Sequence, residues 1–269
     1  MYKLKLGTSV STIVENTINV NFEHQIKRLK KLGFDSIDLN VVIFRRQDVY
    51  EECLKHYPLF KKILDDNGIM LNAVHMPFGA LIDLSTPDES HRQKSLALAC
   101  KTFDEMDKLN PRCYVFHGSG EPILQQDRQK FFDTLVKSIS YLKDKTSQVI
   151  CVENLPRTCL LNTSDEVNKF LSILPDVKIC LDLNHFLTEK VEDAIIKIGK
   201  PIFTTHVSDH DYVDERHWLP TQGKIDWQKV LNALETIGYD GVFNYELCAN
   251  YDYEQMKETY DYLFNEYNK

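Results

Sequence analysis

The chain has 269 residues, of which 43% are hydrophobic and 27% are charged, as is typical of a globular protein. Its 32 Lys and Arg residues face 40 Asp and Glu residues, so the formal net charge is −8 at pH 7. This charge repels polyphosphate backbones, and we expect no nucleic acid partner. The longest apolar runs, such as residues 149–152, are far shorter than the ~20 residues of a membrane span, so we expect no membrane association.

The cysteines indicate a reducing compartment. There are seven of them, an odd number without a Cys-x-x-Cys pair, and several stand inside apolar runs as small core residues do. The first seven residues alternate polar and apolar side chains and lack the charged start and apolar block of a signal peptide. We therefore predict a cytoplasmic protein whose cysteines are reduced.

Short apolar runs alternate with longer segments of helical period along the whole chain. This alternation is typical of repeated strand–helix units that form a parallel sheet. The chain contains eight such units. The predicted strands are residues 4–10, 36–41, 70–75, 113–117, 149–153, 178–182, 202–206 and 242–246.

The segments between these strands carry signals for helix ends. Glycine can adopt the left-handed conformation that closes a helix, and it stands just before four predicted strands, at residues 33, 68, 199 and 238. Thr163 is followed three residues later by Glu166, a spacing typical of a capping box. That pair predicts the start of the helix that follows the fifth strand.

These units predict an α/β fold, a (β/α)8 TIM barrel, because eight units in 269 residues match the size of that fold. We expect a single domain over residues 1–269, since no Pro/Gly/Ser-rich linker or charge block divides the chain. A doubly wound open sheet is the alternative. It would normally have a glycine-rich phosphate turn after its first strand, and Gly7-Thr8-Ser9 is not one.

The ends of the predicted strands carry the chemistry, because the active site of such a barrel lies at the C-terminal ends of its strands. Any one of these side chains, taken alone, is readily explained as a hydrogen-bonded or surface residue, but six in succession are not. The third to eighth strands end on His75, His117, Glu153, Asp182, His206 and Glu246.

Further donors follow these strands in the loops. His185 lies three residues after Asp182, and Glu215-Arg216-His217 follows the seventh strand. Buried carboxylates and imidazoles without partners cost several kcal/mol, and a shared cation removes that cost. Oxygen-rich sets with one or two imidazoles suit Mn²⁺, Mg²⁺, Co²⁺ or Zn²⁺. We predict one divalent metal here and leave its identity open.

The ordered set of motifs resembles the xylose isomerase-like TIM barrels, a superfamily of sugar phosphate isomerases and epimerases, inosose-type enzymes, ketose 3-epimerases and endonuclease IV. The order and spacing match over nearly the whole chain. The matching pieces are His75-Met76-Pro77-Phe78, Val115-Phe116-His117, Val152-Glu153-Asn154, Leu181-Asp182-Leu183-Asn184-His185, His206-Val207-Ser208-Asp209, the run Glu215 to Asp226, and Tyr245-Glu246.

The resemblance implies a metal-dependent isomerase or epimerase acting on a small sugar, sugar phosphate, inosose or polyol. It implies that Glu153, Asp182, His206 and Glu246 bind one divalent metal. It also implies that the two glutamates are catalytic and exchange protons with carbons next to a carbonyl. The residues that we expect to contact substrate or to bind further metal are His75, His117, His185, Glu215, Arg216 and His217.

The resemblance leaves a second function open, a zinc phosphodiesterase acting on abasic DNA, because endonuclease IV holds several zinc ions. This chain has a candidate at each corresponding position, with Glu215 in place of an aspartate. The acidic net charge and the lack of a basic stripe beyond Arg45-Arg46 argue against it. A barrel that binds a sugar without converting it is a third interpretation, which the retention of both glutamates disfavours.

The last strand–helix unit departs from the family pattern. Thr221-Gln222-Gly223 stands where the family usually has Gly-x-Gly, which leaves the tight turn there open. The identity of the sugar, the reacting carbon and the oligomeric state, a homo-oligomer included, are also left open.

Overall fold

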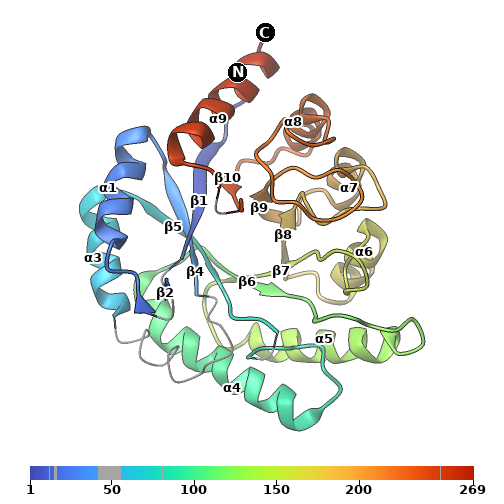
Figure 1. The fold of residues 1–269 in the computed structure, drawn as a ribbon. Coiled ribbons are helices and arrows are strands. Elements are labelled where there is room, and N and C mark those ends of the chain that lie inside the picture. Colours follow the sequence, from blue (N-terminus) through green and yellow to red (C-terminus); the bar gives the residue numbers. More distant parts are fainter. Residues whose placement is uncertain (12, 15–16, 42–55, 80, 249) are drawn as a thin grey trace.

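The computed structural model describes the chain except for residues 12, 15–16, 42–55, 80 and 249. Eight parallel strands close into a barrel in the order β1-β10-β9-β8-β7-β6-β5-β4. The helices form a ring around these strands (Figure 1). The predicted (β/α)8 fold is confirmed, and the open sheet is excluded because β1 pairs with both β4 and β10.

The strand positions follow the predictions closely. Four strands have the predicted bounds, three differ by one residue at the C-terminal end, and the first strand is shifted by one residue at both ends. The barrel strands are β1 Lys5–Ser11, β4 Ser36–Asn40, β5 Met70–His75, β6 Cys113–His117, β7 Val149–Glu153, β8 Lys178–Asp182, β9 Ile202–Val207 and β10 Val242–Tyr245. The short strands β2 Ile13–Val14 and β3 Thr17–Ile18 pair with each other outside the barrel.

The helices pack their apolar faces on the outside of the barrel, as the sequence period predicts. The N-terminal and C-terminal ends of the chain lie side by side (Figure 1), and the Tyr2 backbone N–H donates to Asn268 Oδ1 over 2.9 Å. The helices are α1 Phe22–Leu32, α3 Tyr57–Asn67, α4 Glu89–Met106, η1 Asp107–Leu109, α5 Arg128–Leu142, α6 Ser164–Ile173, α7 Val191–Ile198, α8 Trp227–Thr236 and α9 Tyr253–Tyr267.

The predicted helix-end signals are present with some differences. Gly33 and Gly68 close α1 and α3 in the left-handed conformation, whereas Gly199 closes α7 with a φ of 71° and a ψ of −139°, and Gly238 follows Ile237, the residue that caps α8. Thr163 caps α6, accepting from the backbone N–H of Glu166 over 3.3 Å. The Glu166 carboxylate does not return to Thr163, because it accepts from the backbone N–H of Leu161.

Small side chains from four neighbouring strands form a cluster that is separate from the main hydrophobic core. Ala73, Cys113, Val115, Cys151 and Cys180 form a separate buried cluster contributed by β5 to β8. The six cysteines among the described residues are free, as predicted, and Cys53 lies outside the described residues. None of the described helices is long and apolar enough to cross a membrane.

Candidate metal centre

The mouth of the barrel brings together the side chains that were predicted at the strand ends. The last residues of β5, β6 and β7 are His75, His117 and Glu153. Asp182 ends β8, His206 lies one residue before the end of β9, and Glu246 directly follows β10. Since all eight strands are parallel, these positions share one end of the barrel.

A cavity of about 470 Å³ opens at this mouth, within the ~300–1,000 Å³ that small-molecule sites typically occupy. His75, His117, Glu153 and Glu246 are among the residues that line it. These four side chains therefore face a space that can accept a small ligand, and Asp182 and His206 are not among the residues that line it.

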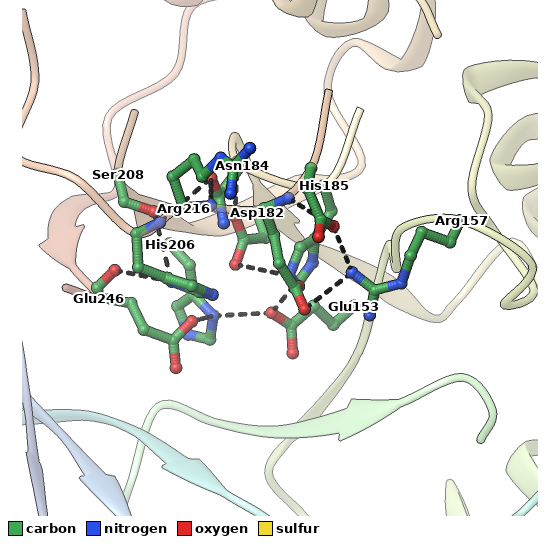
Figure 2. Close-up of polar contacts among 12 residues, drawn as sticks. Glu153, Arg157, Asp182, Asn184, His185, His206, Ser208, Arg216 and Glu246 are labelled. Atoms are coloured by element: carbon green, nitrogen blue, oxygen red, sulfur yellow. Dashed lines mark hydrogen bonds and ion pairs between the residues drawn. The ribbon is translucent and has the colours of Figure 1, made fainter. Parts of the chain in front are cut away.

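Four of these residues form what we call the inner cluster: Glu153, Asp182, His206 and Glu246. Each offers a ligand atom, and these atoms all lie within 4.8 Å of one another. His206 Nδ1 is 2.9 Å from Glu153 Oε1 and 2.9 Å from Glu246 Oε2. Figure 2 shows the two glutamates converging on the same imidazole.

The inner cluster holds more negative charge than its own histidine can balance. Glu153 and Asp182 are fully buried. Burial by itself raises the pKa of Glu153, but the charge of His206 and that of His117 outweigh burial and hold this pKa well below its usual value. Burial, with the nearby Glu153 and Glu246 carboxylates, raises the pKa of Asp182 to about 7.

The donor set fits a divalent cation. Asp182 Oδ2 is buried, lies 3.5 Å from His185 Nε2 and has no hydrogen-bond partner among the described residues, which leaves one carboxylate oxygen to be satisfied. Three carboxylates and one imidazole are a combination that Mn²⁺, Mg²⁺, Co²⁺ and Zn²⁺ accept. A cation at this position would offset the cost of burying these charges.

Two further histidines contact the other oxygen of Glu153. His75 Nε2 lies 3.2 Å and His117 Nε2 lies 3.3 Å from Glu153 Oε2. Phe78 stacks on the His117 ring with 4.0 Å between ring centroids, and Phe78 also lines the cavity. These contacts hold the Glu153 carboxylate in place and form one wall of the cavity.

Asparagines next to the ligands fix the ends of the strands. The Asn154 side chain accepts from the Asp182 backbone N–H over 2.7 Å and donates to the Asp182 carbonyl over 2.9 Å. The Asn184 backbone N–H donates to Asp182 Oδ1 over 2.6 Å. Asp182 is therefore held from β7 and from its own loop.

A second group lies nearer the rim, and we call His185, Glu215 and His217 the outer cluster. Their ligand atoms also lie within 4.8 Å of one another. His185 Nε2 is 3.2 Å from Glu215 Oε2. The hydrogen bond from His185 lowers the pKa of Glu215 to about 2. Although burial opposes it, the charge of Asp182 and the bond to Glu215 raise the pKa of His185 to about 10.

The outer cluster has a guanidinium that sequence reasoning missed. Arg157 Nη1 lies 2.9 Å from Glu215 Oε1 and 2.8 Å from Asp214 Oδ1, and Nη2 lies 2.6 Å from Glu121 Oε1. In Figure 2, Arg157 approaches from the side opposite Glu246. No sequence signal marks Arg157, because its partners come from two other loops.

The side chain of Arg216, a predicted substrate contact, lies outside the cavity and pairs with Asp211. Its guanidinium is 2.9 Å from Asp211 Oδ2, and Arg216 is not among the residues that line the cavity. Its backbone N–H donates to Asn184 Oδ1 over 3.1 Å, so it helps to hold the loop. Arg45-Arg46 lies outside the described residues.

The turn that departs from the family pattern is formed nonetheless. Thr221 takes the place of a glycine and has a φ of +79°, which is a strained conformation for a β-branched residue. Its backbone N–H donates to Asp209 Oδ2 over 2.9 Å. A Cβ atom on Gly223 would lie 2.3 Å from Asp209 Oδ1, so glycine is required at that position.

The closed barrel and the inner cluster at its mouth define a class of protein, the α/β barrels with a carboxylate-rich candidate metal site. Within that class, the family model for the xylose isomerase-like TIM barrel matches residues 26–265. The chain belongs to this family, and the predicted resemblance is confirmed.

Relatives within reach of sequence comparison include sugar enzymes. The chain is 24% identical to D-psicose 3-epimerase of Ruminiclostridium cellulolyticum over 84% of this chain and 78% of the relative. It is 23% identical to inosose isomerase of Bacillus velezensis over 98% of each chain. A crystal structure of D-psicose 3-epimerase with D-tagatose from Clostridium cellulolyticum has a TM-score of 0.79 at 20% identity, over 98% of both chains.

Proposed function

We propose that this protein is a divalent-metal-dependent carbohydrate isomerase or epimerase that transfers a proton at a carbon next to a carbonyl. The observation that carries the proposal is the pair of carboxylates, Glu153 and Glu246, that contact one nitrogen of His206 and line the same cavity. The names of the relatives support the same class of reaction.

Glu153, Asp182, His206 and Glu246 would hold the cation. When bound, a divalent metal polarises a carbonyl and a neighbouring hydroxyl and so acidifies the C–H bond between them. The neighbouring His75 and His117 keep the Glu153 carboxylate oriented while it serves as a ligand.

The two glutamates are assigned the proton transfers. Although burial opposes it, the charge of His206 holds the pKa of Glu246 well below its usual value, so this carboxylate is ionised at neutral pH and can accept a proton. Glu153 is ionised for the same reason. One glutamate removes the proton from carbon, and the other takes up a proton from solvent and returns it on the opposite face or at the adjacent carbon.

The surroundings of the pair suit a small polyhydroxylated substrate. Aromatic and imidazole faces, Phe78 stacked on His117, form one wall. Glu215 and Arg157 supply charged hydrogen-bonding groups at the rim. A sugar presents apolar C–H faces and several hydroxyl groups, and such a wall and rim can contact both.

The zinc phosphodiesterase alternative has less support. It needs the outer cluster for a further metal, and Arg157 already places a positive charge on Glu215. The names of the sugar-converting relatives also favour the isomerase or epimerase.

The test is solvent exchange measured by mass spectrometry. The protein is incubated with Mn²⁺ and a panel of ketoses, aldoses and inososes in D₂O. We expect deuterium at the reacting carbon of at least one substrate. Glu246→Gln and Glu153→Gln each keep the size of the side chain but remove the base, so the exchange rate should fall by about 10²–10⁴-fold.

A matched control separates this loss from general damage. Glu235→Gln makes the same change at the C-terminal end of α8, where the carboxylate bonds only to Tyr267 in the described structure. Its exchange rate should equal that of the unmodified protein. Turnover without solvent label would contradict the proton-transfer assignment, as would exchange that both active-site substitutions leave unchanged.

A further inference from the structure

A series of hydrogen bonds between buried polar side chains crosses the barrel interior beneath the inner cluster. Asn72 Nδ2 on β5 donates to Asp38 Oδ1 on β4 over 2.7 Å and to Thr204 Oγ1 on β9 over 2.9 Å. Strands β5 and β9 are not neighbours in the barrel, so this second bond crosses the interior. All three side chains are fully buried.

At one end of this series of hydrogen bonds, Asp38 faces the ring nitrogen of His206 that points away from the inner cluster. Asp38 Oδ2 faces His206 Nε2 at 3.4 Å, and each atom is buried without a hydrogen-bond partner among the described residues. Leaving both atoms unsatisfied would cost the full desolvation penalty of each group. A single proton on Nε2, with a shift of a few tenths of an ångström, satisfies both atoms at once.

That proton decides which nitrogen faces the inner cluster as a lone pair. With Nε2 protonated, Nδ1 is the nitrogen that gives up its proton when a cation binds, and Nδ1 is the atom that lies 2.9 Å from both Glu153 and Glu246. Histidines that bind metals commonly donate their other N–H to a carboxylate, which fixes the tautomer and the ring orientation.

We propose that Asp38 is a positioning residue that holds His206 as the Nε2–H tautomer, with Nδ1 directed at the cation site. The inference rests on the cation site of the proposed function and is independent of the substrate. Asp38 is not among the residues that line the cavity.

The orientation of Asp38 is set from the opposite end of the barrel. Arg112 Nη1 donates to Asn72 Oδ1 over 2.9 Å, and the Arg112 guanidinium stacks over Phe203 at 4.8 Å from the ring centroid. With its oxygen occupied, the Asn72 amide can present only its NH₂ group to Asp38. The acceptor role of Asp38 Oδ1 is therefore fixed.

This arrangement gives the substitution Asp38→Asn a defined consequence. The new side chain must offer its carbonyl oxygen to Asn72, so its NH₂ group would face His206 Nε2. That nitrogen would then accept, and the proton would move to Nδ1, where it blocks the ligand position. The size of the side chain is unchanged.

The experiment measures Zn²⁺ affinity by competition with a fluorescent chelator, and the visible spectrum of the Co²⁺-loaded protein. Asp38→Asn should lower Zn²⁺ affinity by about 10–100-fold and change the Co²⁺ spectrum, while its circular dichroism stays that of the unmodified protein. Thr204→Val is the matched control, because it removes another bond of Asn72 but leaves the contact between Asp38 and His206. Its Zn²⁺ affinity should stay within about twofold even if it melts earlier.

Two outcomes would overturn the proposal. One is an Asp38→Asn protein that binds Zn²⁺ as tightly as the unmodified chain, and the other is an equal loss in Thr204→Val. If Asp38→Asn does not fold, ¹⁵N-histidine NMR of the unmodified Zn²⁺-loaded protein decides: His206 should carry its proton on Nε2, and a proton on Nδ1 contradicts the inference.

The same measurements separate this inference from the proposed function. An unmodified protein that binds no divalent metal would remove the cation site and both proposals with it. Tight Zn²⁺ binding that Asp38→Asn leaves unchanged would remove only the role of Asp38.

Discussion

The inner and outer clusters contain the same kinds of side chain but differ in how their charge is balanced. In the inner cluster, three carboxylates surround one imidazole, and their other positive partners are neighbouring histidines at 3.2 to 3.5 Å, with no arginine or lysine paired to them among the described residues. Asp182 Oδ2 has no hydrogen-bond partner among those residues. In the outer cluster, Glu215 has both a histidine and an arginine within 3.2 Å. The outer group is balanced by the chain itself, whereas the inner group calls for a cation from outside.

The difference shows that ligand types alone do not identify a metal site. Both clusters satisfy the spacing that a metal needs, and the sequence presents candidates for each. Arg157, which is not a ligand type, separates the two. A buried set of acids without a fixed positive charge is therefore the better indicator of a bound cation.

The largest expected effect comes from Asp182→Ala. In the unmodified protein, a Mn²⁺ concentration 100 times the dissociation constant should stabilise the fold by about 2.7 kcal/mol and raise the melting temperature by about 5–10 °C. The substitution removes a ligand and should abolish this rise, together with the metal content measured by elemental analysis.

Glu215→Gln tests the outer cluster in the same assay. It should keep the metal-dependent rise in melting temperature, because Glu215 already has Arg157 and His185 as partners. Full metal occupancy in Asp182→Ala, or its loss in Glu215→Gln, would reverse the distinction between the clusters.

The second effect concerns the acid stability of the outer cluster. The pKa of Glu215 is about 2, below its ordinary value of 4.5. A lowered pKa contributes stability that is fully present above pH 4.5 and is lost as the pH falls toward about 2. Glu215→Gln should lower the free energy of unfolding by about 2 kcal/mol at pH 7, a figure that allows for partial solvent screening.

Urea unfolding at a series of pH values measures this contribution. The difference between the unmodified protein and Glu215→Gln should shrink steadily below pH 4.5. A difference that stays constant down to pH 3 would show that the ion pairs of Glu215 add nothing to stability.

The smallest effect on stability is expected for Arg157→Ala. Arg157 is about one-third exposed, and ion pairs at such positions typically contribute ~0–1 kcal/mol. The removal leaves Glu215 without its fixed positive charge, so a second and weaker Zn²⁺ should bind at the outer cluster.

Isothermal titration with Zn²⁺ gives the stoichiometry, and Arg216→Ala is the control because Arg216 pairs with Asp211 instead. We expect one Zn²⁺ per chain in the control and two in Arg157→Ala. One Zn²⁺ in both variants would mean that Arg157 is not what distinguishes the clusters.

Sequence patterns predicted the barrel and the side chains at its mouth because both depend on local regularities, and the family resemblance then selected the four residues of the inner cluster. The strand patterns locate the barrel strands within one residue, and parallel strands necessarily carry their last side chains to one mouth. His75, Glu153 and Asp182 could be placed together before any contact was known. A family-pattern glycine was missing at Thr221, and the hydrogen bond to Asp209 holds that turn in its place.

The tertiary structure alone decided that Arg157 balances the charge of Glu215 and that Asp38 faces His206. Arg157 is 58 residues from Glu215 and 36 from Glu121 along the chain, and no periodicity links such positions. Asp38 lies in β4, where polar and apolar residues alternate, and the sequence gives no sign that its side chain is buried or that it contacts His206. These contacts form only when the barrel closes, because closure places strands and loops that are far apart in the sequence next to one another. The charges and hydrogen bonds of the site therefore depend on the tertiary structure.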